Sequence, residues 1–241
     1  MSTRQKPSVP NKLLAALAPE DLAALEPHLE VVELSRGQVL YESRDTIRHA
    51  YFPHSCVVSL LAVMEDGGSA EVALFGCEGV LGLASSIVTP ESFGRYIVQL
   101  PRTASRIAMD RLEGVLNDRP AVRDLVRRYI EALLKQTFQT VACNALHGVE
   151  ARCCRWILSM HDRMNADTLP LTHEFLAEML GVQRSTVSLV TRTLQTAGLI
   201  SQSRGVITVT DRAGLEESTC ECYGTIRRTF ERLLPGTYTH A

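Results

Sequence analysis

The sequence has few of the features that mark membrane-bound or secreted proteins. No stretch of its 241 residues approaches the roughly 18 to 20 consecutive apolar residues that a membrane-spanning helix needs. Residues 1–11 are polar, carry Pro7 and Pro10, and lack the apolar segment of a secretory signal. These absences predict a cytoplasmic protein with no membrane partner, in which residues 1–11 form a disordered lead.

Disulfides, excess charge and catalytic motifs are missing as well. The 7 cysteines are odd in number and irregularly spaced, which argues against a disulfide framework. The formal net charge of −2 means that nucleic acid could bind only where Lys and Arg cluster on one face. We find no nucleophile–base pair and no Walker-type phosphate loop, so the sequence does not predict an enzyme.

Short apolar runs separated by Gly, Pro and Asp fill residues 12–119 and predict an antiparallel, jelly-roll-like β-roll in an α+β protein. Examples of these runs are Val31–Leu34, Gln38–Tyr41, Cys56–Val63, Glu71–Phe75 and Tyr96–Leu100. Two short helices, Lys12–Leu17 and Pro19–Leu25, should precede the roll. Asp66-Gly67-Gly68 predicts a hairpin turn, because Gly tolerates a positive φ.

A long helix is predicted over residues 120–147, with Pro120 in its first turn, where the missing N–H costs nothing. Its apolar stripe contains Val122, Val126, Tyr129 and Leu133. Because the helix exceeds the usual globular length, we interpret it as a dimerisation helix with these four residues in the contact. A core helix is the alternative interpretation.

Residues 148–241 contain a pattern of helix, turn, helix and hairpin. Thr172 is a suitable N-cap for the first helix, and Gly181 is a suitable end for it. A second helix is expected over Arg184–Thr196, followed by two strands around Arg204-Gly205 and, beyond Thr210, one further helix. This order predicts a winged helix-turn-helix domain.

In such a domain the second helix lies in the major groove of double-stranded DNA. The predicted DNA-binding residues are Thr172, Arg184, Ser185, Thr186, Ser188, Leu189, Arg192 and Arg204. Arg184, at the start of the helix, is expected to read a guanine, and Arg192 to meet phosphate. A helical hairpin with a solvated polar face remains the alternative.

The roll, the long helix and the segment LTHEFLAEMLGVQRSTVSLVTRTLQTAGLISQSRGVITV together resemble the Crp/Fnr family of bacterial transcription regulators. The resemblance covers roughly residues 12–210. It implies a homodimer on a palindromic DNA site, with RNA polymerase as a further partner. Arg184, Ser185 and Leu189 fall where the cyclic-AMP-responsive members use Arg, Glu and Arg. Only the first matches, so the half-site of those members is not expected here.

The resemblance also places an effector pocket in the roll. Its positions in this chain are Glu78, Gly79, Val80, Gly82, Arg95 and Tyr96. Val80 stands where nucleotide-binding members carry the ribose-binding Glu, and Tyr96 replaces a hydroxyl partner of the phosphate. We therefore expect that cyclic AMP is not the effector. Glu78 keeps a shifted alignment open, and another ligand, or none, remains possible.

Cysteine and histidine pairs raise metal or redox chemistry as alternatives. The iron–sulfur members of the family use an N-terminal cysteine cluster, and this chain has no cysteine before Cys56. Candidate pairs are Cys143 with His147, at helical i, i+4 spacing, Cys153-Cys154 and Cys220-x-Cys222. No pair supplies a full ligand set, so we predict no metal site and no cofactor. A ligand- or redox-sensing module acting on protein partners, with a weak or vestigial DNA domain, is the alternative function.

Overall fold

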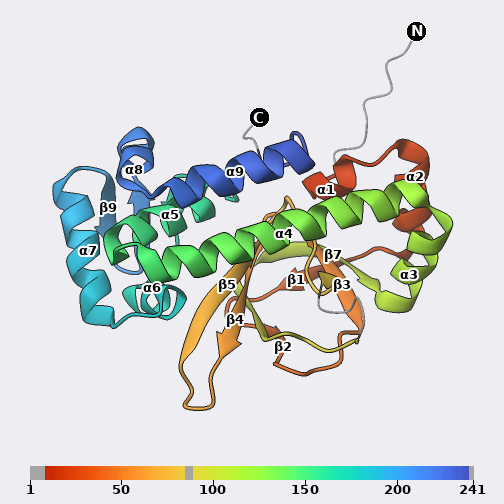
Figure 1. Cartoon of the computed structure of the whole chain (residues 1–241), viewed down its shortest axis with the longest axis horizontal. Helices are drawn as coiled ribbons and strands as arrows, with labels where there is room; N and C mark the ends of the chain where they lie inside the picture. Colours follow the sequence, from red (N-terminus) through yellow and green to blue (C-terminus); the bar gives the residue numbers. More distant parts are fainter. Residues whose placement is uncertain (1–8, 85–88, 165, 239–241) are drawn as a thin grey trace, which may run out of the picture.

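A single long helix organises the molecule. The computed structural model describes residues 9–84, 89–164 and 166–238. Helix α4 (Pro120–Leu146) runs lengthwise through it, with the β-roll beneath and α9 (Glu221–Leu233) alongside (Figure 1). The helix-turn-helix lies at one end of α4 and helices α2 and α3 at the other (Figure 1). Over these described ranges no helix is both long and apolar enough to cross a membrane.

The predicted antiparallel roll is confirmed. Its strands are β1 (Glu30–Leu34), β2 (Val39–Tyr41), β3 (His49–Pro53), β4 (Val57–Val63), β5 (Ser69–Phe75), β6 (Arg95–Leu100) and β7 (Arg102–Ala108). They form two sheets, in the orders β1-β7-β3 and β2-β6-β4-β5. The expected turn at Asp66-Gly67-Gly68 joins β4 to β5, with Val63 opposite Ser69. Strands β3 and β7 were not predicted; in β7, polar residues such as Arg102, Thr103 and Arg106 interrupt the apolar pattern.

Short helices flank the roll. They are α1 (Lys12–Ala15), α2 (Pro19–Leu25), the 3-10 turn η1 (Glu26–His28) and α3 (Met109–Asp118). Asn11 is fully buried; its side chain accepts from Leu14 N and donates to the carbonyl oxygens of Pro53 and Gly79. The prediction that residue 11 belongs to a disordered lead is therefore wrong. Residues 1–8 of that lead lie outside the described residues.

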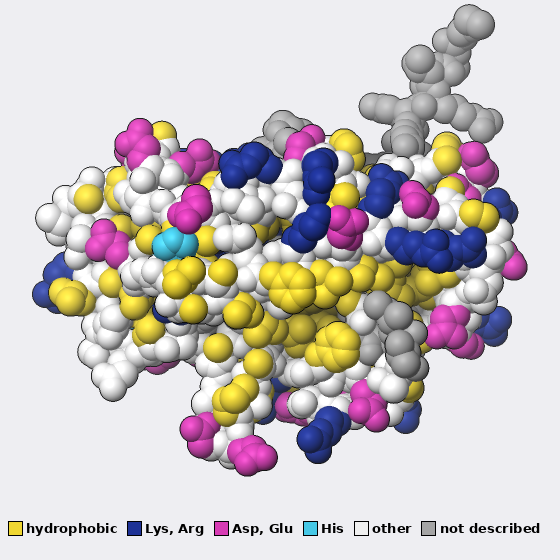
Figure 2. Space-filling model, viewed as in Figure 1, with side chains coloured by type: hydrophobic (Ala, Val, Ile, Leu, Met, Phe, Trp, Pro, Cys, Tyr) yellow, Lys and Arg dark blue, Asp and Glu magenta, His cyan; other side chains and the backbone are white. Residues whose placement is uncertain are grey.

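The predicted dimer face of α4 is also wrong. Val122, Val126, Tyr129 and Leu133 are all buried in the core that α4 shares with the roll. A second apolar stripe lies on the outer side of the helix, where Leu134, Phe138 and Val141 are 50%, 68% and 57% exposed. Figure 2 shows hydrophobic side chains gathered along this side of α4 and over the adjoining roll. The helix therefore has two apolar faces, and only the outer one is uncovered.

The C-terminal part contains the expected winged helix-turn-helix and, over its described residues, two helices that were not predicted, α5 before the motif and a second helix in the tail. Its elements are α5 (Val149–His161), β8 (Thr168–Leu169), α6 (His173–Leu180), α7 (Arg184–Thr196), β9 (Ile200–Ser203), β10 (Val206–Val209), α8 (Arg212–Ser218) and α9. The tail forms two helices, because Thr219 and Cys220 are extended between α8 and α9. Helix α9 packs along α4, and its apolar residues Ile226 and Phe230 join the core of the roll.

Two buried carboxylates join the roll to the DNA-binding part. Glu71 on β5 accepts hydrogen bonds from Ser59 Oγ at 2.5 Å and from Trp156 Nε1 on α5 at 3.0 Å. Glu78 forms an ion pair with Arg163 at 2.7 Å, and both side chains are almost fully buried. The two parts also share a core in which Val57 and Leu61 of the roll belong to one cluster with Trp156. They pack as one unit.

Glu71 should make stability depend on pH. Burial raises its pKa to about 7, so between its unfolded pKa of about 4.3 and pH 7 the folded chain binds more protons than the unfolded chain. The free energy of unfolding should therefore fall as pH rises through this range, by up to about 3 kcal/mol. Glu71→Gln should remove that loss, as measured by urea unfolding at pH 5 and pH 8. Glu65→Gln, at an exposed position, is the control. A Glu71→Gln profile with the wild-type slope would contradict this assignment.

Candidate nucleic-acid interface

Local signals in the sequence fix the two helices of the motif. Thr172 Oγ1 accepts a hydrogen bond from Phe175 N at 3.2 Å, which caps the N-terminus of α6 as predicted. Gly181 ends α6 in the left-handed conformation, with a φ of 63° that favours glycine. At the same end, Arg152 on α5 donates to the carbonyl oxygen of Leu180, placing a positive charge at the helix C-terminus. Helix α6 is thus held at both ends.

Helix α7 presents a polar and basic face to solvent. Arg184, Ser185, Leu189 and Arg192 are exposed, and the Leu189 residue is 66% exposed. The opposite face, with Val187, Val190 and Leu194, is buried. Of the other predicted DNA-binding residues, Thr186 and Ser188 are half-buried, Thr172 caps α6, and Arg204 is exposed at the turn of the wing between β9 and β10. The exposed arginines give this end of the chain the local basic character that phosphate binding requires.

A histidine that the sequence did not single out as an orienting residue holds α7 and the wing against α6. His173 Nε2 lies 2.7 Å from Gln202 Oε1 on β9, which can only accept, so Nε2 carries the proton. Nδ1 lies 2.9 Å from Ser188 Oγ on α7. Gln202 in turn donates to the carbonyl oxygen of Thr191, a buried residue. The contacts of His173 with Ser188 and of Gln202 with Thr191 therefore orient α7. The sequence signal that could have indicated this contact is Gln202, a polar residue that lies on the same inward face of β9 as Ile200.

Arg184 forms an ion pair with a neighbouring carboxylate. Its Nε lies 2.8 Å from Glu174 Oε1, and both side chains are about two-thirds exposed. Such an exposed pair contributes only about 0 to 1 kcal/mol, so Arg184 can leave it at little cost. A groove runs beside the pair, lined by Thr172, His173, Arg184 and the wing residues 202–207. Recognition helix and wing therefore border one continuous polar surface.

The residues expected to form an effector pocket are occupied by contacts within the chain. Glu78 is bound to Arg163, and Val80 and Tyr96 are buried in the core of the roll. Arg95, expected to hold a phosphate, is paired with Glu42 at 2.9 Å. Gly79 lies against the ring of Tyr129, and Gly82 against the carbonyl of His49.

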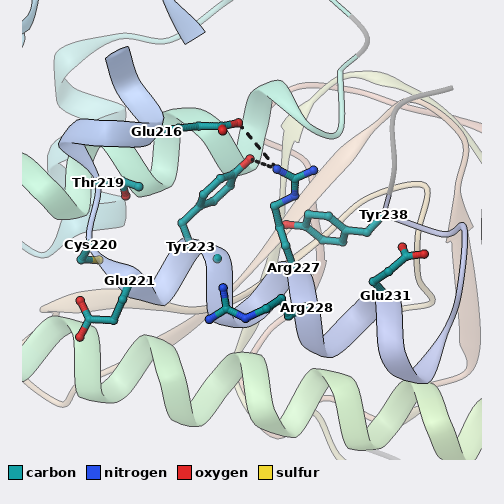
Figure 3. A pocket seen from close by; sticks show the side chains of 10 residues that line it. Glu216, Thr219, Cys220, Glu221, Tyr223, Arg227, Arg228, Glu231 and Tyr238 are labelled. Carbon is teal, nitrogen blue, oxygen red and sulfur yellow. Dashed lines mark hydrogen bonds and ion pairs between the residues drawn. The ribbon is translucent and has the colours of Figure 1, made fainter. Parts of the chain in front are cut away.

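A pocket of about 510 Å³ opens elsewhere, between α8 and α9 (Figure 3). It is lined by Glu216, Thr219, Cys220, Glu221, Tyr223, Gly224, Arg227, Arg228, Glu231 and Tyr238. Arg227 reaches the Tyr223 hydroxyl at 3.4 Å and Glu216 at 3.6 Å, so these charged and polar groups are already engaged with one another (Figure 3). None of the six expected effector residues lines it.

Known proteins share both the motif and the fold. Residues 151–218 match the family described as the Crp-like helix-turn-helix domain. The global nitrogen regulator of Synechococcus elongatus is 23% identical over 199 residues, which cover 78% of this chain and 89% of that protein. The global nitrogen regulator of a Nostoc species is 25% identical over 196 residues, covering 77% of this chain and 86% of that protein.

Solved structures show the same fold. FixK2 from Bradyrhizobium japonicum superposes with a TM-score of 0.70 at 16% identity, covering 80% of this chain and 98% of that one. The c-di-GMP responsive global regulator CLP from Xanthomonas campestris gives a TM-score of 0.66 at 17% identity, covering 80% and 99%. The matched domain, the exposed α7 and its wing define a DNA-binding transcription regulator of the winged helix-turn-helix class. The matched Crp-like domain and the regulators among its relatives support the Crp/Fnr type of regulator that the sequence resemblance predicted.

Proposed function

We propose that this chain binds a palindromic DNA site as a homodimer, with one α7 helix in each of two successive major grooves. The observation that carries the proposal is the exposed, arginine-bearing face of α7, held against α6 and the wing by His173. A two-fold dimer presents two such helices, so its half-sites are related by the same symmetry and lie about one helical turn apart. Leu189 offers no hydrogen bond and suits a thymine methyl group.

The outer stripe of α4 supports the homodimer. Leu134, Phe138 and Val141 recur at spacings of four and three residues, which places them on one helix face. All three are at least half exposed in a single chain, and large contiguous apolar patches of this kind mark interaction surfaces. We infer that two copies of α4 pack through this stripe, in place of the four residues that the sequence suggested.

Arg184→Ala should lower affinity by about 1 to 3 kcal/mol and relax the preference at one base pair of each half-site, because a bidentate guanine contact is lost. Arg192→Ala should weaken all sequences alike and reduce the slope of affinity against salt, because a phosphate contact is lost. Fluorescence anisotropy with DNA from just upstream of the chain's own operon measures both effects. Arg228→Ala, exposed on α9, is the control. If Arg192→Ala altered base preference and Arg184→Ala did not, our placement of α7 in the groove would be wrong.

We also infer that cyclic AMP is not the effector. Glu78, the substitute ribose ligand of a shifted alignment, is held by Arg163, and Arg95 by Glu42. Rebuilding these contacts around a nucleotide would break a buried ion pair, at a cost of several kcal/mol. Isothermal titration calorimetry should therefore detect no binding of cyclic AMP at micromolar concentrations. A low-micromolar affinity would contradict this inference.

The alternative of a redox-sensing module has little support from the cysteines of the roll. Burial raises the pKa of Cys56 to about 12 and that of Cys77 to about 11, so these thiols of the roll stay protonated and unreactive at neutral pH. The relatives named above are regulators, which also favours a non-enzymatic role. We place the chain in the cytoplasm, with bacterial DNA, and infer RNA polymerase as its partner at promoters.

A further inference from the structure

Four metal-binding side chains from distant parts of the sequence meet where α4 ends and α9 begins. Cys143 lies in the last turn of α4, and His147 is its C-cap residue. Cys220 is the N-cap residue of α9, and Cys222 lies in its first turn. The ligand atoms of all four side chains lie within 4.8 Å of one another. The sequence showed these residues only as two separate pairs, neither of which completes a site.

The spacing fits a single ion. Around a tetrahedral Zn²⁺, with Zn–S near 2.3 Å and Zn–N near 2.0 Å, neighbouring ligand atoms lie about 3.5 to 3.8 Å apart. The sulfurs of Cys143 and Cys220 are 3.5 Å apart, and Cys222 Sγ is 3.5 Å from His147 Nδ1. An iron–sulfur cluster would need its ligands set more widely around several atoms. We propose that Cys143, His147, Cys220 and Cys222 form a tetrahedral binding site for one zinc-class divalent cation.

Surrounding groups orient the ligands as they do in known metal sites. With His147 Nδ1 turned toward Cys222, Nε2 lies 3.3 Å from a carboxylate oxygen of Glu221. A carboxylate behind a ligating imidazole fixes the ring and raises its basicity. Gln139 Nε2 donates to the sulfur of Cys222 at 3.0 Å. Each of these contacts favours the metal-binding form of its ligand.

The local charge also suits an occupied site. Three thiolates and one divalent cation carry a net charge of −1, which needs a positive neighbour when it is buried. Arg155 and Arg152, both buried on α5, interact electrostatically with Cys143. Arg155 Nε has no hydrogen-bond partner among the described residues. These guanidinium groups would balance the charge of the loaded site.

An ion can reach the site from the surface. Cys220 lines the open pocket between α8 and α9, where Figure 3 shows its sulfur at one end. Binding displaces the thiol protons into solvent through this opening. The loaded site would tie the C-terminus of α4 to the N-terminus of α9, beside Gly148, the N-cap residue of α5. It would therefore brace the junction between the dimer helix and the DNA-binding domain.

Metal analysis of the full chain tests the proposal. Protein purified under reducing conditions with Zn²⁺ and then dialysed should retain one zinc per chain by inductively coupled plasma mass spectrometry. Replacement by Co²⁺ should give the intense visible bands of a tetrahedral site together with near-ultraviolet thiolate charge transfer. A chain that retains no zinc, or that binds Co²⁺ without thiolate absorption, would overturn the proposal.

Variants assign the ligands. Cys220→Ser and His147→Gln should each lower the zinc affinity at least tenfold and change the Co²⁺ spectrum, because each removes a ligand. Glu221→Gln should weaken zinc binding about 10-fold to 100-fold but keep the Co²⁺ spectrum, because it removes only the carboxylate behind His147. Cys77→Ser, in the roll, is the control and should behave as wild type. If a ligand variant fails to fold, the Tm of the wild-type chain still tests the site. A chelator should lower this Tm, and added zinc should restore it. A Tm that responds to neither would count against the site.

Discussion

Replacing Phe138 by glutamate is expected to leave the chain monomeric and to remove its tight binding to a two-fold symmetric DNA site. Phe138 is 68% exposed in the middle of the outer α4 stripe, so the substitution should not disturb the fold of a single chain. In the dimer, each copy would bury a carboxylate without a partner, which costs on the order of 3 kcal/mol or more and weakens association at least about 100-fold. Sedimentation at micromolar concentration measures the result.

Two further substitutions make this test specific. Met64→Glu, at an exposed apolar position away from α4, should leave the dimer intact. Leu133→Glu should unfold the chain, because Leu133 is 7% exposed and belongs to the chain's own core. A folded Phe138→Glu variant that remains dimeric would show that the outer stripe is not the interface.

Glu78→Ala is expected to cause a large loss of stability, because it breaks the buried ion pair with Arg163. Arg163 would be left buried, with its other bonds to Ser159 O and the Tyr238 hydroxyl but without its carboxylate. Removing one partner of a buried ion pair costs about 3 to 5 kcal/mol. For a chain of this size the loss corresponds to a fall in Tm of roughly 10 °C. Thermal unfolding followed by circular dichroism measures it.

The matching double variant separates the ion pair from simple loss of packing. In Glu78→Leu combined with Arg163→Met, both charges and their desolvation cost are gone, so most of the stability should return. Glu78→Ala losing less than about 1 kcal/mol, or a double variant no better than the single one, would contradict a stabilising role for this pair.

The parts of the fold that depend on local signals were predictable from the sequence. Helix α7 runs over Arg184–Thr196 as expected, because Thr172 and Gly181 mark the ends of the preceding helix through their own side-chain and backbone chemistry. Strand β7 was missed because it carries Arg102, Thr103 and Arg106, yet it lies at the centre of its sheet. Its place is set by pairing with β1 and β3, which the local pattern does not contain.

The orientation of α4 and the grouping of the cysteines depend on long-range packing. Helical periodicity identifies apolar residues on α4 but does not say which stripe, Val122 to Leu133 or Leu134 to Val141, the roll will cover. In the same way, Cys143 and Cys220 are 77 residues apart in sequence and meet only because α9 packs back along α4. The exposed face of α7 needed no such information, since it follows from one helix and its two neighbours.

Selection from a pool of random DNA duplexes with the purified chain tests the central claim most directly. We expect an enriched, two-fold symmetric sequence, with half-sites about 10 base pairs apart and a guanine whose enrichment disappears in Arg184→Ala. Retention of DNA without any enriched sequence, or enrichment of a site without two-fold symmetry, would contradict it.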